Sequence, residues 1–152
     1  MPTAALVLLV VLGLVGCAPK EKEPTAASVR AEVETLFENY VEALNRSDST
    51  GVLSAYAPGT EVTLAGRGQF FRGAIGTTAG EALLNPGQNS YELDTLDVIP
   101  IERAHVLALV EYSVEPTDQD IPAFHSAATY VLRKAGAKWQ IIHAHVCPAR
   151  EQ

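Results

Sequence analysis

The chain has 152 residues, with 11 lysines and arginines against 18 aspartates and glutamates and a formal net charge of −7. This length supports a single domain, and a hydrophobic share of 47% is enough to build a packed core. The acidic balance, without a cluster of basic residues, argues against a nucleic-acid partner, and two cysteines rule out a disulfide framework and a multi-cysteine zinc site.

The first seventeen residues form an apolar leader that ends in a cysteine. Residues 4–15 carry no polar side chain, and twelve residues are too few for a membrane-spanning helix, which needs about 20. The length instead fits the apolar region of a secretory signal peptide. A buried N-terminal strand or helix is the alternative, but no polar residue interrupts the run to give it two faces.

The leader ends in Leu14-Val15-Gly16-Cys17, which resembles the lipobox of bacterial lipoproteins. In those proteins the cysteine receives acyl chains, palmitate among them, and becomes the N-terminus of the mature chain. The resemblance implies a signal peptide over residues 1–16, a lipidated Cys17, and a tether over residues 17–27. It places the protein in the bacterial cell envelope, held by lipid at the outer membrane or the cell surface, with the membrane as its partner.

Helical patterns follow the tether. Apolar residues recur at steps of three and four over residues 28–44, which predicts an amphipathic helix with glutamates on its opposite side. Asp48 or Ser49 is expected to cap a short second helix. The pattern then predicts, in chain order, strands over residues 61–64 and 69–72 and a weak third helix over residues 75–84.

The second half of the chain is strand-like. Alternating apolar and polar residues, separated by turn residues, predict four long strands over residues 91–101, 105–114, 124–132 and 139–146. The last two flank a turn and are expected to pair as a hairpin. Helices first and antiparallel strands later predict one α+β domain over residues 28–148, with helices covering one face of a curved antiparallel sheet, and a short tail over residues 149–152.

Two parts of the domain resemble one superfamily. Residues 39–45, Asp48 and residues 52–56 look like the opening of the nuclear-transport-factor-2-like superfamily, to which SnoaL-like and ketosteroid-isomerase-like proteins belong. Residues 126–132 and 138–145 are similar to the association domain of calcium/calmodulin-dependent kinase II. The resemblance implies a cone-shaped sheet wrapped around the long N-terminal helix, with an apolar pocket at one end. It also implies a homodimer, because the outer sheet face in this superfamily commonly packs against a second subunit.

Strand alternation divides the predicted sheet into two faces, and the resemblance says which face is inside. The inner face is small and apolar, which suits a small apolar ligand. Its predicted pocket-lining residues, with Tyr40 from the helix, are Val106, Ala108, Val110, Tyr112, Thr129, Val131, Ile142, Ala144 and Val146. The predicted dimer face on the last strand consists of Trp139, Ile141, His143 and His145.

The residues at the matching positions disfavour isomerase chemistry. Ketosteroid isomerases use an aspartate base and a tyrosine–acid pair that stabilises an enolate oxygen. Tyr40 matches the tyrosine, but the base position falls on Leu64 and the second acid falls on Thr129. A leucine cannot accept a proton, and threonine is a far weaker donor than a protonated carboxyl group in an apolar site.

His143 and His145 point the same way along one strand, which is compatible with a zinc site that takes His125, or the carboxylate of Glu111, as its third ligand. Because a two-residue motif is a weak metal signal, we expect no metal or other cofactor and place both histidines in the subunit interface. Cys147 has no partner in the chain once Cys17 is lipidated, and it is expected to be a buried thiol.

Three functions remain open. The favoured one, because the isomerase acids are missing, is a lipid-anchored protein that binds a small apolar molecule in its cone or acts as a dimeric interaction module. The alternative in the same pocket is a SnoaL-like enzyme, a cyclase, isomerase or hydrolase, with Tyr40, Tyr112 and His125 as candidate catalytic residues. The third is a metal-dependent activity at His125, His143 and His145.

Overall fold

A computed structural model describes residues 25–59, 62–66, 69–73 and 89–148. The predicted signal peptide, Cys17, most of the predicted tether, the expected helix over residues 75–84 and the tail lie outside the described residues. Within the described part of the chain, no helix has both the length and the apolar composition to cross a membrane.

Two helices open the domain where the apolar periodicity predicts them. Helix α1 (Ala26–Asn45) is capped by Thr25, whose hydroxyl oxygen accepts a hydrogen bond from a first-turn backbone N–H at 3.2 Å. Helix α2 (Ser49–Ser54) is capped by Asp48, whose carboxylate accepts from the backbone N–H of Gly51 at 2.9 Å, as predicted. The buried stripe of α1 consists of Val29, Val33, Phe37, Tyr40, Val41, Ala43 and Leu44.

In the described part of the chain, six strands form one sheet in the order β2-β1-β6-β5-β4-β3. They are β1 (Thr63–Gly66), β2 (Gln69–Arg72), β3 (Asn89–Glu102), β4 (His105–Pro116), β5 (Phe124–Ala135) and β6 (Lys138–Pro148). Neighbours run antiparallel except β1 and β6, which are parallel, so the sheet is mixed and not antiparallel throughout as predicted. A hairpin forces its strands to run antiparallel, whereas β1 and β6 are far apart along the chain, so no tight turn sets their direction.

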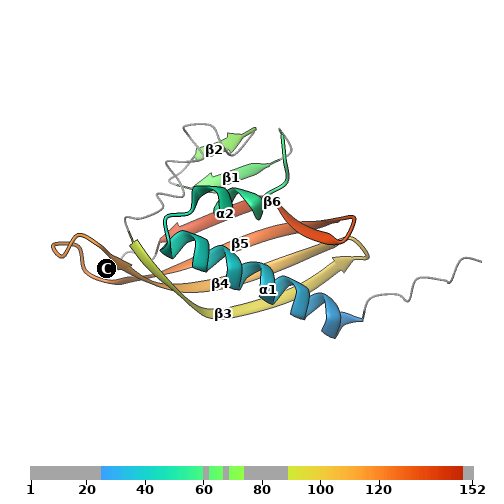
Figure 1. Ribbon diagram of the computed structural model, residues 1–152, viewed down its shortest axis with the longest axis horizontal. Helices are drawn as coiled ribbons and strands as arrows, with labels where there is room; N and C mark the ends of the chain where they lie inside the picture. Colours follow the sequence, from blue (N-terminus) through green and yellow to red (C-terminus); the bar gives the residue numbers. More distant parts are fainter. Residues whose placement is uncertain (1–24, 60–61, 67–68, 74–88, 149–152) are drawn as a thin grey trace, which may run out of the picture.

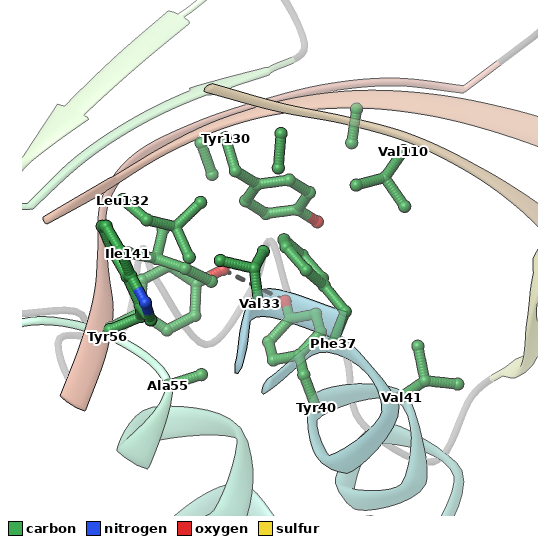
Figure 2. Packing of buried hydrophobic residues seen from close by; sticks show 14 of the residues in the cluster. Val33, Phe37, Tyr40, Val41, Ala55, Tyr56, Val110, Tyr130, Leu132 and Ile141 are labelled. Carbon is green, nitrogen blue, oxygen red and sulfur yellow. Dashed lines mark hydrogen bonds between the residues drawn. The ribbon is translucent and has the colours of Figure 1, made fainter. Parts of the chain in front are cut away.

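The helices cover one face of the curved sheet. In Figure 1, α1 crosses the face of β3, β4 and β5, while α2 lies beside β1 and β6. Buried side chains from the two layers meet between them, and the ring centroid of Phe37 on α1 lies 4.9 Å from that of Tyr130 on β5 (Figure 2). Removal of these apolar surfaces from water holds the layers together, and the arrangement confirms the predicted α+β cone.

Strand β5 turns the opposite set of residues inward from the set predicted. Tyr130 and Leu132 are buried in the core, so Thr129 and Val131, predicted to line the pocket, lie half-buried on the outer face. The pairing agrees, because Tyr130 lies opposite the buried Ala108 of β4. Alternation gives the period of a strand and not its phase, and β5 carries small or apolar residues in both phases.

A β-bulge divides β6 into two halves of opposite phase. Leu132 pairs with Ile141 and Val131 pairs with His143, which leaves Ile142 as the extra residue. Before the bulge, Trp139 and Ile141 belong to the core. They are 6% and 0% exposed, so their placement on the predicted dimer face is wrong. Beyond the bulge, Ala144 is buried on the inner face, while His143 and His145 lie on the outer face. Strict alternation along a sequence cannot show an inserted residue.

The bulge gives the adjacent Ile141 and Ile142 different degrees of burial. Ile141→Ala should lower the free energy of unfolding by about 2–5 kcal/mol, because it empties a fully buried site. Ile142→Ala should cost much less, because the Ile142 side chain is only half-buried. Urea unfolding followed by Trp139 fluorescence measures both values. A larger loss for Ile142→Ala would place the bulge elsewhere.

Candidate functional site

The five tyrosines of the chain form one connected row between α1 and the sheet. The hydroxyl oxygens of Tyr40 and Tyr56 lie 3.0 Å apart, and those of Tyr112 and Tyr130 lie 3.2 Å apart. The ring centroids of Tyr40 and Tyr130 are 6.3 Å apart, and Tyr91 extends the row at 6.4 Å from Tyr112. These rings meet edge to face, a geometry that aromatic pairs favour.

Five different elements bring these tyrosines together. Tyr40 lies on the buried stripe of α1, and Tyr112 and Tyr130 occupy inward positions of β4 and β5. Tyr56 follows α2 on a backbone bridge to β6. Tyr91 on β3 makes two backbone hydrogen bonds with the side chain of the last residue of α1, at 2.8 and 2.9 Å. In Figure 2, the rings of Tyr40, Tyr56 and Tyr130 lie among the buried apolar side chains beside α1.

Burial keeps these phenols neutral. Loss of hydration raises the pKa of Tyr40, Tyr56 and Tyr112 well above the ordinary tyrosine range. Burial raises the pKa of Tyr130 to about 12, and hydrogen bonds from Tyr112 and Tyr40 act in the opposite direction. At neutral pH the row therefore offers hydroxyl donors and acceptors, and no charge.

The row has a hydrogen to spare. Four of its hydroxyls are linked in two pairs, and they carry four hydrogens. Each pair uses one hydrogen internally, and even a further bond between the pairs would leave at least one hydrogen for an acceptor outside them. Tyrosine is thus able to donate to a ligand oxygen here without leaving another phenol unpaired.

The remainder of the described interior is apolar. Among the residues that the structure describes, Ser126 is the only buried side chain that is neither apolar nor aromatic. Leu64, at the position of the isomerase base, is buried, whereas Thr129, at the position of the second acid, faces away from the tyrosines. Candidate catalytic residues Tyr40 and Tyr112 thus lie together in the core, without a carboxylate or imidazole buried beside them in the described residues.

The inner face is less deeply buried at one end of the sheet. Val146 follows Ala144 by two residues and pairs with the buried Ala128, so it belongs to the inner face, yet it is 38% exposed. Phe124, at the start of β5, is also only partly buried. Of the predicted pocket residues, Val106, Ala108, Val110, Tyr112 and Ala144 are buried on this face. Their role as a pocket lining stays a prediction.

Two cavities lie on the flanks of α1. One of about 430 Å³ lies between α1, α2 and the β5–β6 turn, with Tyr40 and Trp139 in its wall. On its edge, Glu32 accepts hydrogen bonds from Trp139 Nε1 at 2.7 Å and Lys134 Nζ at 2.6 Å, and the Lys134 bond lowers the pKa of Glu32. The second cavity, of about 300 Å³, lies at the start of α1 against Val106. Of these two cavities, the first adjoins the tyrosine row, through Tyr40.

The three candidate metal ligands lie on the outer face, and the structure does not bring them together. His125 lies near Asp94, with Nδ1 3.6 Å from the carboxylate, to which Ser113 donates a hydrogen bond at 2.9 Å. His143 and His145 lie on another strand. In the described ranges, no three His, Cys, Asp or Glu side chains are close enough to hold a metal ion. His125 is therefore separated by the sheet from Tyr40 and Tyr112.

The position of Cys147 differs from the buried thiol that was expected. Cys147 is exposed on the outer face of β6, and its Sγ lies 3.3 Å from Nε2 of His145. The predicted buried thiol is therefore wrong, because Cys147 follows His145 by two residues on the same strand and so shares the outer face on which His143 and His145 were expected. The spacing of His145 and Cys147, two residues apart on a strand, was the signal for this contact.

Comparison with known proteins agrees with this fold. The model of the SnoaL-like domain family matches residues 33–151. An NTF2-like protein of unknown function from Pseudomonas putida is 24% identical, with a TM-score of 0.69, over 84% of this chain and 92% of its own. An NTF2-like superfamily protein from Salmonella enterica is 14% identical, with a TM-score of 0.68, over 84% and 95%. A candidate dehydratase of the NTF2-like family from Streptomyces avermitilis is 16% identical, with a TM-score of 0.69, over 84% and 100%. No curated protein matches the chain.

Because the phenols are buried, we predict that the folded protein loses stability at alkaline pH. Because their pKa values are raised in the folded state, the unfolded chain releases phenol protons above about pH 10 that the folded chain retains. The contribution of these four phenols to the free energy of unfolding should stay constant up to about pH 10. Above it, each of the four phenols should remove up to about 1.4 kcal/mol per pH unit.

Tyrosinate absorbance and circular dichroism, recorded together during an alkaline titration, measure this effect. The two signals should change together, and Tyr56→Phe should reduce the slope by about one phenol. Ionisation of all five tyrosines near pH 10 with an unchanged circular dichroism spectrum would contradict the burial of the row.

Proposed function

The chain belongs to the SnoaL-like domain family, and we propose that it holds a small, largely apolar molecule in its cone and that lipid on Cys17, as the resemblance of residues 14–17 to a lipobox implies, anchors it in the cell envelope. The observation that carries the proposal is the tyrosine row, whose neutral hydroxyls lie in an otherwise apolar interior. Such a combination, an apolar wall with a few placed polar groups, is typical of small-molecule sites.

The less buried end of the inner face is the proposed entrance. The half-exposed Val146 and Phe124 offer apolar surface there, and Tyr112 and Tyr130 lie further along the same face. A ligand that fits has an apolar body and one oxygen acceptor, such as a ketone, quinone or ether, to take the spare hydroxyl hydrogen. An anionic ligand does not fit, because no cationic side chain is buried among the described residues.

Binding is better supported than turnover. The dehydratase description applies to the Streptomyces protein. That protein is 16% identical to this chain, and a likeness at that level concerns the fold and not the activity. Proton abstraction needs a base near the substrate, and the described interior offers phenols whose pKa is raised by burial. The third candidate catalytic residue, His125, lies on the opposite face of the sheet and cannot complete a site with Tyr40.

The proposed anchor lies close to the domain. Thr25, the cap of α1, stands eight residues after Cys17. Eight extended residues span at most about 28 Å, so lipid on Cys17 would hold the cone near the membrane surface. The start of α1 lies against Val106 at one end of β4, whereas Val114 pairs with Phe124 at the other end, so the proposed entrance lies at the end of the domain away from the anchor.

The outer face of the sheet is proposed to bind a second copy. Ile99 and Leu109 are 45% and 39% exposed on β3 and β4, and Leu107 and Val131 lie beside them on the same face. A contiguous apolar surface of this kind is typical of a protein contact. Trp139 and Ile141 have no part in it, because both are buried in the core. A monomeric mass in sedimentation equilibrium would contradict the dimer.

Nile red, an apolar dye with one carbonyl oxygen, tests the ligand site. Its fluorescence should rise on binding to the protein. Tyr112→Phe should weaken binding about five- to fiftyfold, because it removes a hydroxyl at the proposed site. Tyr56→Phe is the matched control, because Tyr56 lies at the far end of the row, and it should change the affinity much less. Absence of binding, or equal effects of the two substitutions, would contradict the proposed site.

Detergent partition tests the anchor separately. In cells that process lipoproteins, the full chain should enter the detergent phase, and Cys17→Ser should move it to the aqueous phase because no acyl chain is attached. Cys147→Ser is the matched control and should partition like the parent chain. Retention of Cys17→Ser in the detergent phase would contradict lipidation at this residue and leave the ligand site untouched.

A further inference from the structure

The outer face of β6 carries a thiol and an imidazole in direct contact. Cys147 Sγ lies 3.3 Å from His145 Nε2, within hydrogen-bond distance for sulfur. The thiol is exposed, so a reagent in solution can reach it. A nucleophile within hydrogen-bond reach of a base is the geometry by which proteins activate a cysteine.

The strand holds this pair in place. His145 pairs with Thr129 on β5 and with Ala65 on β1, and Cys147 pairs with Ala127 on β5. Ser126 donates a hydrogen bond to the backbone oxygen of Cys147 at 3.4 Å. The two side chains therefore stand side by side on a paired strand.

No charged side chain competes for the thiol from the paired strands. The residues paired with the two positions, Ala65, Ala127 and Thr129, are all uncharged. His143, on the same face, is two residues from His145 in the direction away from Cys147. On β5, His125 lies on the same face two residues before Ala127, and its polar contacts are with Asp94 and Ser113. Among the described residues, His145 is thus the titratable group in contact with Cys147.

We propose that Cys147 and His145 form a reactive thiol–imidazole pair that captures small disulfides, such as oxidised glutathione or cystine, as a reversible mixed disulfide. His145 Nε2 accepts the thiol proton, and Cys147 Sγ attacks one sulfur of the reagent. The disulfide bond of the reagent breaks as the new sulfur–sulfur bond forms. The leaving thiolate takes the proton from the imidazolium, so Cys147 is oxidised and half of the reagent is reduced.

The chain offers no better partner for this thiol. Its other cysteine, Cys17, is the residue proposed to carry lipid, so an internal disulfide is not available to Cys147 under the proposed function. Disulfides also persist in the bacterial envelope and not in the cytosol. The thiol–imidazole contact itself does not depend on the anchor.

Oxidised glutathione and the purified full chain test the proposal. Mass mapping of peptides should find the adduct on Cys147, which also separates it from any reaction at a free Cys17. At pH 7, His145→Gln should slow adduct formation about three- to tenfold, because the thiol loses its proton acceptor while the attacking sulfur keeps its access. At pH 9.5 the two rates should converge, because an ordinary thiol is largely ionised there without help.

His143→Gln is the matched control and should react like the parent chain at both pH values. Equal rates for His145→Gln and the parent at pH 7 would overturn the proposal. A His145→Gln rate lowered by the same factor at both pH values would also overturn it, because that result indicates a change in access. Equal slowing by His143→Gln would overturn it too, by showing a general effect of charge on the strand.

Discussion

A buried phenol must find a hydrogen-bond partner, and this requirement joins the layers of the molecule at the centre of the fold. Tyr40 from α1 is paired with Tyr56 after α2, and Tyr112 from β4 is paired with Tyr130 from β5. Apolar packing brings the helices onto the sheet but has no direction of its own, whereas these hydroxyl pairs have fixed geometry. The same groups that hold the elements in register are the polar groups that a ligand would meet.

The sequence predicts the elements well because their signals are local. The stripe of α1, the Asp48 cap and the four long strands all follow from periodicity and turn residues within a short window. Phase and direction are not local. Which face of β5 is buried depends on its partner β4, and β1 runs parallel to β6 because of where the chain enters the sheet. The sequence of a single strand therefore shows neither its buried face nor its direction in the sheet.

The same difference explains the outcome at the candidate site. Tyr40 and Tyr112 were predicted to face inward, since a helix stripe and a regular strand keep one phase throughout. Tyr130 was missed because the phase of β5 was inverted, and the error on β6 arose from the single residue inserted at Ile142. One bulge thus lets Trp139 and Ile141 lie in the core while His143, His145 and Cys147 beyond it lie on the outer face. A bulge depends on both strands of a pair, so the sequence of one strand does not show it.

Alternation also lets one sheet support two kinds of chemistry. On β6, Ala144 faces the neutral tyrosine interior while His145 and Cys147 face solvent, separated only by the thickness of the strand. The inner side excludes charge because burial makes ionisation costly, and the outer side tolerates it because water remains near. A disulfide formed on Cys147 would add its bulk beside the face proposed for the second copy. Formation of a mixed disulfide on Cys147 and dimerisation through the outer face are therefore expected to oppose each other where the adduct reaches the apolar surface around Leu109.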